Sequence, residues 1–449
     1  MNQWLNFNFI YKPVINLYYD SSFWKIVKEL YSTEILTKEL LERRTKMLLE
    51  ILLKRVYTES SYFKNKLFES GYNPGGRFSR ESFSSIIPMT KHEIRNSMSE
   101  MGSGSNKVSY RSTSGTTGEP LIFAKDRIAS MYMDAAMHQV YGWYGIHPRD
   151  PEGRFWGSAI TTRGKITQSL KDWLLNRRRL SSFRMGEEEC ESFWKLLRRF
   201  NPKYFYCYPN AACHFAEYLK ATGKHGEELK LKVIICTGEI LLPHQRSLLE
   251  NVFQCPVANE YGSTENGILA FQCPDGRLHV MSQNILIEVV DEHGKPKING
   301  EMGNILVTEL HSHNIPFIRY ALGDLGAFTG EECPCGRSYP VMEIQVGRID
   351  GFIVTKSHKK VYDVILAYTF KKDFLKFRGY QRQVGKLYIE YIPRKNFDVS
   401  CLNMQSSSLK KYLGDDMIIE FKEVKEIKPL PSGKLTYFVS EIADEKLRF

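Results

Sequence analysis

The chain has 449 residues, of which 42% are hydrophobic and 25% are charged, and its formal net charge is +11. A chain of this length can bury a large core and fits a two-domain enzyme. The positive charge would suit nucleic acid or an anionic membrane, but no helix-turn-helix, zinc-finger or RNP pattern is present. We therefore expect no nucleic-acid partner. No run of about 18 apolar residues occurs, so we also expect no transmembrane segment.

The beginning of the chain is predicted to be helical over residues 1–80, with one long helix at residues 37–56. The aromatic side chains between Trp4 and Trp24 could contact a membrane interface or pack on the protein itself. Interspersed lysine, proline and aspartate residues favour packing on the protein.

A segment rich in hydroxyl groups and glycine follows, with the sequence YRSTSGTTGEP at residues 110–120. Its glycines permit positive φ and close backbone approach, so successive N–H groups can line a concave anion site. The segment lacks the P-loop spacing and its lysine, so hydroxyl and backbone donors would contact the phosphate. A plain surface turn is the alternative. The residues predicted to bind nucleotide phosphate are Thr113, Ser114, Gly115, Thr116, Thr117 and Gly118.

The middle of the chain shows a helical pattern at residues 188–200 and a turn at residues 236–239, after an apolar run. That turn fits an adenine-contacting loop or a plain turn. The sequence NEYGSTEN at residues 259–266 places an aromatic ring and a carboxylate at a strand end. Glu265 is the natural magnesium ligand, because Mg²⁺ prefers one or two carboxylates with phosphate oxygens and water. The nucleotide contacts predicted here are Gly238, Glu239, Tyr261, Gly262 and Thr264.

Strands are predicted at residues 285–290 and 304–309, and three further motifs follow them. In RYALGD, interpreted as a turn, Asp324 can accept two hydrogen bonds from ribose hydroxyls. In GRID, Arg348 would reach ribose or phosphate. In PLPSGK, the ammonium of Lys434 could contact both the α-phosphate and the substrate carboxylate as charge develops between them.

These motifs, in this order, resemble the adenylate-forming superfamily of acyl-CoA synthetases, luciferases and peptide-synthetase adenylation domains. The likeness spans about residues 80–440 and is strongest to the phenylacetate-CoA ligase branch, especially relatives assigned to capsular polysaccharide biosynthesis. It implies an α/β fold with a large mixed N-terminal nucleotide- and acid-binding domain at residues 1–346. It also implies a small mobile α+β C-terminal lid at residues 347–449, with a hinge near Asp350. Strand-like alternation at residues 386–392 and 417–421 suits this lid.

The resemblance implies a cytoplasmic ligase that uses ATP and Mg²⁺ to form an acyl adenylate, with Lys434, Glu265 and Thr116 as catalytic residues. The acyl group would then pass to a thiol, most simply that of coenzyme A. The alternatives are an adenylating acyltransferase that delivers to an amine or hydroxyl, and a nucleotide-binding protein without activity. Gly351 replaces a second acidic residue of many relatives and so removes a charged contact, which makes the thioester-forming geometry less secure than adenylation. Glu119 also stands where many relatives have lysine. A homodimer is compatible with the sequence.

The nine cysteines and the absence of a signal peptide predict a reducing compartment without disulfides, in which most of the thiols are core residues. One group differs, because its spacing permits a Cys₃His structural zinc site, with unmetallated thiols as the alternative. This group comprises Cys273, His279, Cys333 and Cys335. The basic run at residues 177–179 is interpreted as a solvated helix end, with contact to substrate or membrane as the alternative.

Overall fold

The computed structural model describes residues 12–72, 79–102, 108–112, 121–157, 162–182, 185–348, 352–358, 360–370, 373–394, 397–428 and 437–442. The described chain forms two compact units. The large unit holds the residues up to Glu343 apart from Gly323–Leu325, and the small unit holds Gly323–Leu325 and the residues from Ile344 onward. The domain limits expected at residues 346 and 347 stay a prediction. No helix in the described part of the chain is both long and apolar enough to cross a membrane.

Helices build the N-terminal part of the large unit, as predicted. The long helix begins after Thr37, whose hydroxyl accepts a hydrogen bond from the backbone N–H of Leu40 at 3.4 Å, a typical N-cap. It runs three residues beyond the predicted end at Val56. The helices of this part are α2 (Lys12–Tyr19), α3 (Ser22–Ser32), α4 (Lys38–Glu59), α5 (Ser61–Glu69), α6 (Arg80–Ser84) and α7 (Lys91–Met101).

The centre of the large unit is a seven-stranded sheet with the order β4-β3-β5-β6-β7-β8-β9. The strands from β4 to β7 pair in parallel, whereas β8 and β9 continue the sheet antiparallel. The strand β6 is buried at every position, as expected for a parallel strand covered on both faces. The strands are β3 (Glu152–Trp156), β4 (Arg177–Ser181), β5 (Tyr204–Cys207), β6 (Val233–Thr237), β7 (Val257–Ser263), β8 (Gly267–Gln272) and β9 (Leu278–Val280).

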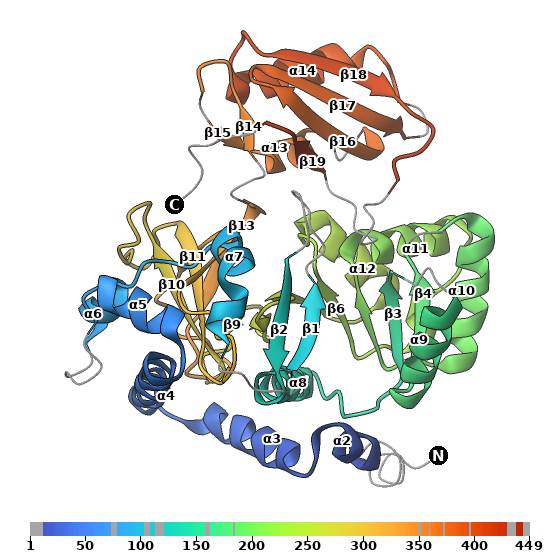
Figure 1. Cartoon of the computed structure of the whole chain (residues 1–449). Helices are drawn as coiled ribbons and strands as arrows, with labels where there is room; N and C mark the ends of the chain where they lie inside the picture. The colour runs from blue at the N-terminus through green and yellow to red at the C-terminus, as the bar shows by residue number, and fades with distance from the viewer. Residues whose placement is uncertain are drawn as a thin grey trace. The chain divides into compact units, whose positions relative to one another are not determined.

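Helices cover both faces of this sheet (Figure 1). Apolar residues of α10, α11 and α12 pack with Phe155 and Phe205 in one core on the first face. On the second face, α8 contacts β8 and is itself covered by α3. The helix predicted at residues 188–200 is confirmed as α10. These helices are α8 (Arg127–Gly142), α9 (Thr162–Leu174), α10 (Glu187–Phe200), α11 (Pro209–Ala221) and α12 (Pro243–Phe253).

The order of the parallel strands creates a topological switch point between β3 and β5. From β3 the chain crosses to β4 on one side, and from β5 it crosses to β6 on the other side. In open α/β sheets, ligands bind outside the carboxyl ends of the strands at such a point. We therefore expect a ligand to bind at the edge of the sheet where β3, β5, β6 and β7 end.

A second sheet has the order β10-β11-β12-β13, and a hairpin pairs β1 with β2. The strands predicted at residues 285–290 and 304–309 are confirmed as β10 and β11. Residues 319–324 were expected to form a turn, but Tyr320 to Asp324 lie in β12, so this expectation was wrong. These strands are β1 (Val108–Ser112), β2 (Ile122–Asp126), β10 (Ile285–Val290), β11 (Gly303–Glu309), β12 (Tyr320–Phe328) and β13 (Met342–Arg348).

The small unit is α+β, as predicted. Its four-stranded sheet has the order β18-β17-β16-β19, with β16 and β17 antiparallel and the outer pairs parallel. The strands expected at residues 386–392 and 417–421 correspond to β17 and β18. The elements are β14 (Phe352–Val354), β15 (Lys360–Tyr362), α13 (Val364–Phe370), β16 (Phe374–Gln383), β17 (Lys386–Pro393), α14 (Cys401–Leu413), β18 (Ile418–Glu423) and β19 (Phe438–Ser440).

Candidate active site

An aromatic cluster occupies the carboxyl ends of β3 and β5, at the topological switch point. The ring of Trp156 stacks on that of Tyr208 with centroids 4.0 Å apart, and its centroid lies 5.4 Å from that of Tyr206. The guanidinium of Arg154 lies 4.3 Å from the centre of the Tyr206 ring. We call Trp156, Tyr206 and Tyr208 the aromatic shelf. Trp156 and Tyr206 are half-buried, so the shelf retains surface for a flat apolar group.

The end of β7 is shaped by glycine. A Cβ at Gly262 would lie 2.7 Å from the carbonyl oxygen of Gly267, so only glycine permits the close pairing of β7 with β8. The register shifts between Tyr261 and Gly262, as in a β-bulge. After this bulge, Thr264 is exposed and Glu265 is buried.

The carboxylate of Glu265 is held by a residue from a distant part of the chain. The hydroxyl of Tyr320, itself fully buried, donates to Oε1 of Glu265 at 3.0 Å. Tyr320 begins β12, so the second sheet supports the side chain predicted to bind magnesium. Both residues were predicted to lie in functional motifs, but their pairing was not predicted.

The residue before Tyr261 connects the end of β7 to the aromatic shelf. The buried carboxyl of Glu260 accepts hydrogen bonds from the hydroxyls of Tyr206 at 2.8 Å and Tyr141 at 3.3 Å. Burial raises the pKa of Glu260, although these hydroxyls oppose the shift. Its polar contacts fix the relative positions of β5, β7 and α8 beneath the candidate site.

The loop after β6 contains Gly238, with φ +73°, and Glu239. One carboxylate oxygen of Glu239 accepts from the backbone N–H of Asn210 at 3.2 Å and from its side-chain amide at 2.9 Å. Asn210 lies in the first turn of α11, where a carboxylate stabilises the helix by satisfying its free N–H groups. Glu239 therefore anchors this loop, and the exposed backbone at Gly238 is left for a ligand.

The other predicted nucleotide contacts are described in part. Asp324 is a half-buried residue of β12. Arg348 ends β13, but its side chain is not among those described. Asp350, Lys434 and the predicted phosphate-binding residues Thr113 to Gly118 lie outside the described residues.

A second cluster brings together the four residues predicted to bind zinc. The potential ligand atoms of Cys273, His279, Cys333 and Cys335 all lie within 4.8 Å of one another. The sulfurs of Cys273 and Cys333 are 3.6 Å apart, and Sγ of Cys335 is 3.2 Å from Nε2 of His279. A tetrahedral zinc with Zn–S bonds of about 2.3 Å would place two sulfurs about 3.8 Å apart. The geometry therefore fits such an ion.

The orientation of His279 also fits a ligand. Its Nδ1 lies 3.0 Å from the carbonyl oxygen of Tyr339, which can accept a hydrogen bond from a protonated Nδ1 and so leave the lone pair of Nε2 for a metal. Burial lowers the pKa of His279 and so favours the neutral ring that metal binding requires.

Comparison with known proteins agrees with this arrangement. The family described as AMP-binding enzyme matches residues 180–311. Phenylacetate-coenzyme A ligase of Thermus thermophilus is 25% identical over 332 residues, which cover 72% of this chain and 74% of that protein. Protein CapK of Staphylococcus aureus is 20% identical over 398 residues, which cover 86% of each chain.

Among solved structures, 2-hydroxyisobutyryl-CoA ligase in the postadenylation state with 2-HIB-AMP has a TM-score of 0.71 at 18% identity, covering 90% of this chain and 89% of that one. The AMP complex of O-succinylbenzoate coenzyme A synthetase from Bacillus subtilis has a TM-score of 0.51 at 15% identity, covering 73% and 67%. These similarities support the predicted likeness to the phenylacetate-CoA ligase branch of the adenylate-forming superfamily. The predicted α/β fold class is therefore confirmed.

In this adenylate-forming enzyme the basic run at residues 177–179 is not the solvated helix end that was expected. The three arginines form the start of β4. Arg177 is buried and its Nε lies 2.8 Å from Oε1 of Glu152, while Arg179 makes two hydrogen bonds of 2.9 and 3.0 Å to Asp172. Charge alone could not distinguish this buried network from an exposed cluster.

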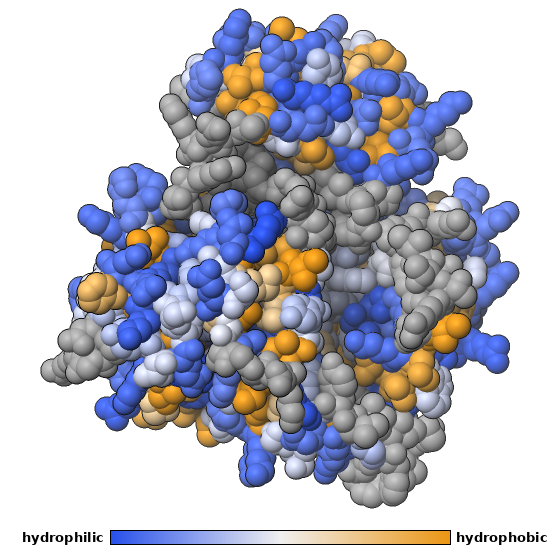
Figure 2. All heavy atoms as spheres, in the orientation of Figure 1, coloured by the Kyte–Doolittle hydropathy of each residue, from blue (hydrophilic) through white to orange (hydrophobic). Residues whose placement is uncertain are grey.

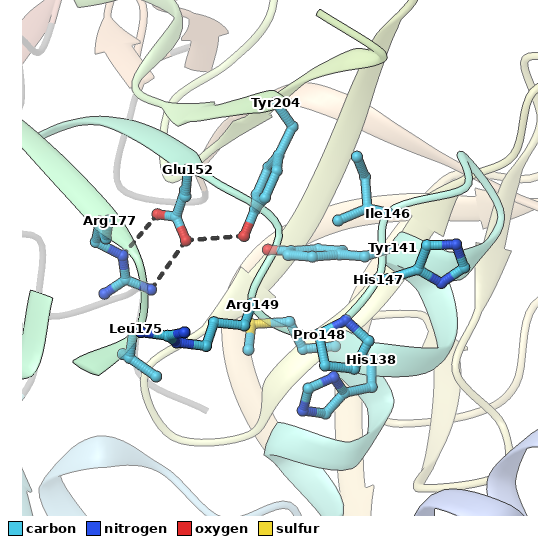
Figure 3. A pocket seen from close by; sticks show the side chains of 11 residues that line it. His138, Tyr141, Ile146, His147, Pro148, Arg149, Glu152, Leu175, Arg177 and Tyr204 are labelled. Carbon is cyan, nitrogen blue, oxygen red and sulfur yellow. Dashed lines mark hydrogen bonds and ion pairs between the residues drawn. The ribbon is translucent and has the colours of Figure 1, made fainter. Parts of the chain in front are cut away.

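The enzyme also has a pocket at the opposite edge of the sheet, where β3, β4 and β5 begin (Figure 3). Glu152 accepts hydrogen bonds there from Tyr204 at 2.9 Å and Arg177 at 3.0 Å. Although burial alone would raise its pKa, Arg154 and Arg177 lower the pKa of Glu152 to about 2. Because these groups pair with one another, we assign them a structural role.

Proposed function

We propose that this adenylate-forming enzyme couples a carboxylic acid to AMP with release of pyrophosphate and then transfers the acyl group to a thiol, most simply that of coenzyme A. The observation that best supports the proposed adenylation step is the position of Glu265, which Tyr320 holds at the carboxyl edge of the parallel strands. Attack of a carboxylate on the α-phosphate brings two anions together, so the site needs a metal ion and positive charge.

The residues present fit that requirement. Glu265 would bind Mg²⁺ together with phosphate oxygens and water, and the ion would neutralise charge on the phosphates. We propose that Tyr261 and the loop at Gly238 and Glu239 contact adenine, that Gly262 and Thr264 shape the site around them, and that Asp324 accepts from the ribose. The residues predicted to bind phosphate or ribose outside the described side chains are Thr113, Ser114, Gly115, Thr116, Thr117, Gly118 and Arg348.

The proposed reaction is tested by ATP–pyrophosphate exchange across a panel of aryl, fatty and hydroxy acids. We expect at least one acid to support exchange and its adenylate to react with coenzyme A. Competition among coenzyme A, amines and sugar hydroxyls would identify the acceptor. Product formed only with an amine or hydroxyl would favour the alternative acyltransferase, and the absence of exchange with every acid would contradict the proposed activation step.

We propose that the aromatic shelf receives the acyl part of the substrate, because its rings lie at the switch point where the fold presents ligands. Trp156→Ala should raise the KM for the acid about ten-fold, with a smaller change in the KM for ATP, since it removes apolar contact with the acid alone. Steady-state exchange kinetics measure both constants. Trp173→Ala, which removes an exposed tryptophan from α9, is the matched control. Equal changes in both constants would argue against an acyl-binding role.

We also propose that Cys273, His279, Cys333 and Cys335 hold one structural zinc, since four protein ligands leave no open position for chemistry. The zinc site would join the end of β8 to the segment between β12 and β13. Metal analysis should find about one zinc per chain, and acid as well as chelators should favour its loss because the ligands must be deprotonated.

Cys333→Ser with Cys335→Ser should release the metal and lower the melting temperature by several degrees, in keeping with loss of a ligand that binds the folded state. Calorimetry with metal analysis measures both effects. Cys401→Ser, at a half-buried thiol outside the cluster, should retain zinc. Wild-type protein purified without zinc, together with an unchanged melting temperature in the double variant, would show that the four residues are ordinary side chains.

A further inference from the structure

The helix α9 exposes an apolar stripe. Ile166, Leu170 and Trp173 are 67%, 58% and 57% exposed. They are spaced by four and three residues and therefore share one face of the helix. Figure 2 shows hydrophobic atoms beside hydrophilic ones over the segment that Figure 1 labels α9. We refer to these three side chains as the α9 stripe.

The other face of α9 is polar where it meets the protein. Asp172 is buried and pairs with Arg179, whose Nε lies 2.9 Å from its carboxylate, and with Arg177 at 3.5 Å. Gln168 is half-buried on the same side. A surface helix of a globular protein normally turns its apolar side inward, so the described side chains of α9 show the reverse arrangement. Such an arrangement indicates an apolar environment outside the protein.

The charge near the α9 stripe indicates which kind of surface, a second protein copy or a membrane, covers these apolar side chains. Lys171 is exposed next to Leu170. Arg178 does not contribute to this charge, because its guanidinium lies over the Phe200 ring of α10 at 4.7 Å. The only carboxylate among the described side chains of α9 is the buried Asp172. A second copy of the chain, related by a two-fold axis, would bring the Lys171 side chains of both copies to one interface, where their like charges repel. An anionic surface would instead attract them, and the net charge of +11 adds to this attraction.

We propose that α9 is a peripheral membrane-binding helix, which lays Ile166, Leu170 and Trp173 into the headgroup region of an anionic bilayer while Lys171 contacts lipid phosphates. Aliphatic and tryptophan side chains on one face with basic residues beside them are the composition that binds such interfaces. The proposal does not depend on which acid is activated.

The test uses the full chain with phosphatidylcholine vesicles that either contain or lack phosphatidylglycerol, followed by flotation. Wild type should float with the anionic vesicles, and Ile166→Ser with Leu170→Ser and Trp173→Ser should reduce vesicle affinity at least about ten-fold. Lys171→Glu should weaken binding to anionic vesicles only, and added salt should remove that difference. ATP–pyrophosphate exchange should be unchanged in both variants.

The matched control replaces three other exposed apolar side chains of the large unit that do not share a helix face, in the variant Ile35→Ser with Phe68→Ser and Ile87→Ser. It should float like wild type. Failure of wild type to float, or equal flotation of the stripe variant, would overturn the proposal. Sedimentation velocity tests the alternative partner. If wild type binds no vesicles but forms a dimer that the stripe variant abolishes, the α9 stripe contacts a second copy of the chain and the proposal is overturned.

Discussion

Lys434→Ala should lower ATP–pyrophosphate exchange at least about a hundred-fold, while the reaction of a supplied acyl adenylate with coenzyme A changes little. The reason is that negative charge develops between the carboxylate and the α-phosphate only in the first step, where the lysine ammonium would stabilise it. In the second step a thiol attacks an adenylate that is already formed. Two separate measurements, isotope exchange and thiolysis of the synthetic adenylate, therefore isolate the role of this residue.

The matched control is Lys425→Ala, which removes an exposed lysine from the same unit and should affect neither step. Equal loss of both steps in Lys434→Ala would remove the residue from its proposed role. Normal exchange in that variant would place the required positive charge elsewhere in the protein.

Glu265→Gln should produce the other large effect, a fall in exchange of about a hundred-fold or more with a greater requirement for added Mg²⁺. Glutamine keeps the size of the side chain and an oxygen that can accept the hydrogen bond from Tyr320, so the variant isolates the loss of charge. A metal bound by one carboxylate and phosphate oxygens depends strongly on that carboxylate. Exchange rates measured over a magnesium titration test this expectation.

Tyr320→Phe separates the position of the carboxylate from its charge. It removes the 3.0 Å hydrogen bond and leaves Glu265 ionisable, so we expect a smaller loss of exchange and a nearly normal response to Mg²⁺. Glu331→Gln, at an exposed glutamate of the same unit, should behave like wild type. Wild-type activity of Glu265→Gln at limiting Mg²⁺ would contradict the metal-binding role.

Helices and strands with a clear hydrophobic pattern in the local sequence were predicted correctly. The strand at residues 285–290 and the long helix predicted at residues 37–56 follow from local hydrophobic patterns. The N-cap role of Thr37 was not predicted. The end of β7 was also predicted, because its apolar run is followed by turn residues. The four zinc-ligand candidates were predicted from their residue types, although distant pairing brings them together.

Other features required tertiary structure. The pairing of Tyr320 with Glu265 joins residues 55 positions apart, and no local pattern encodes it. The arginines of β4 looked solvated because charged residues usually are, whereas Glu152 and Asp172 compensate their burial. The aromatic shelf became visible only when strand order placed the end of β3 beside the end of β5. A reader of the sequence could have noted the aromatic residues that end both strands.

The switch point has a consequence for the divergence of substrate preference among relatives. The crossovers that follow β3 and β5 lead to opposite sides of the sheet, so Trp156 and Tyr208 meet at the boundary between two supersecondary units. Under the acyl-binding role that we propose for the shelf, substitutions at these positions would change the space offered to an acid without altering β7, which carries the proposed metal-binding carboxylate. Acid selectivity would then evolve in small steps while the proposed activation chemistry remains constant.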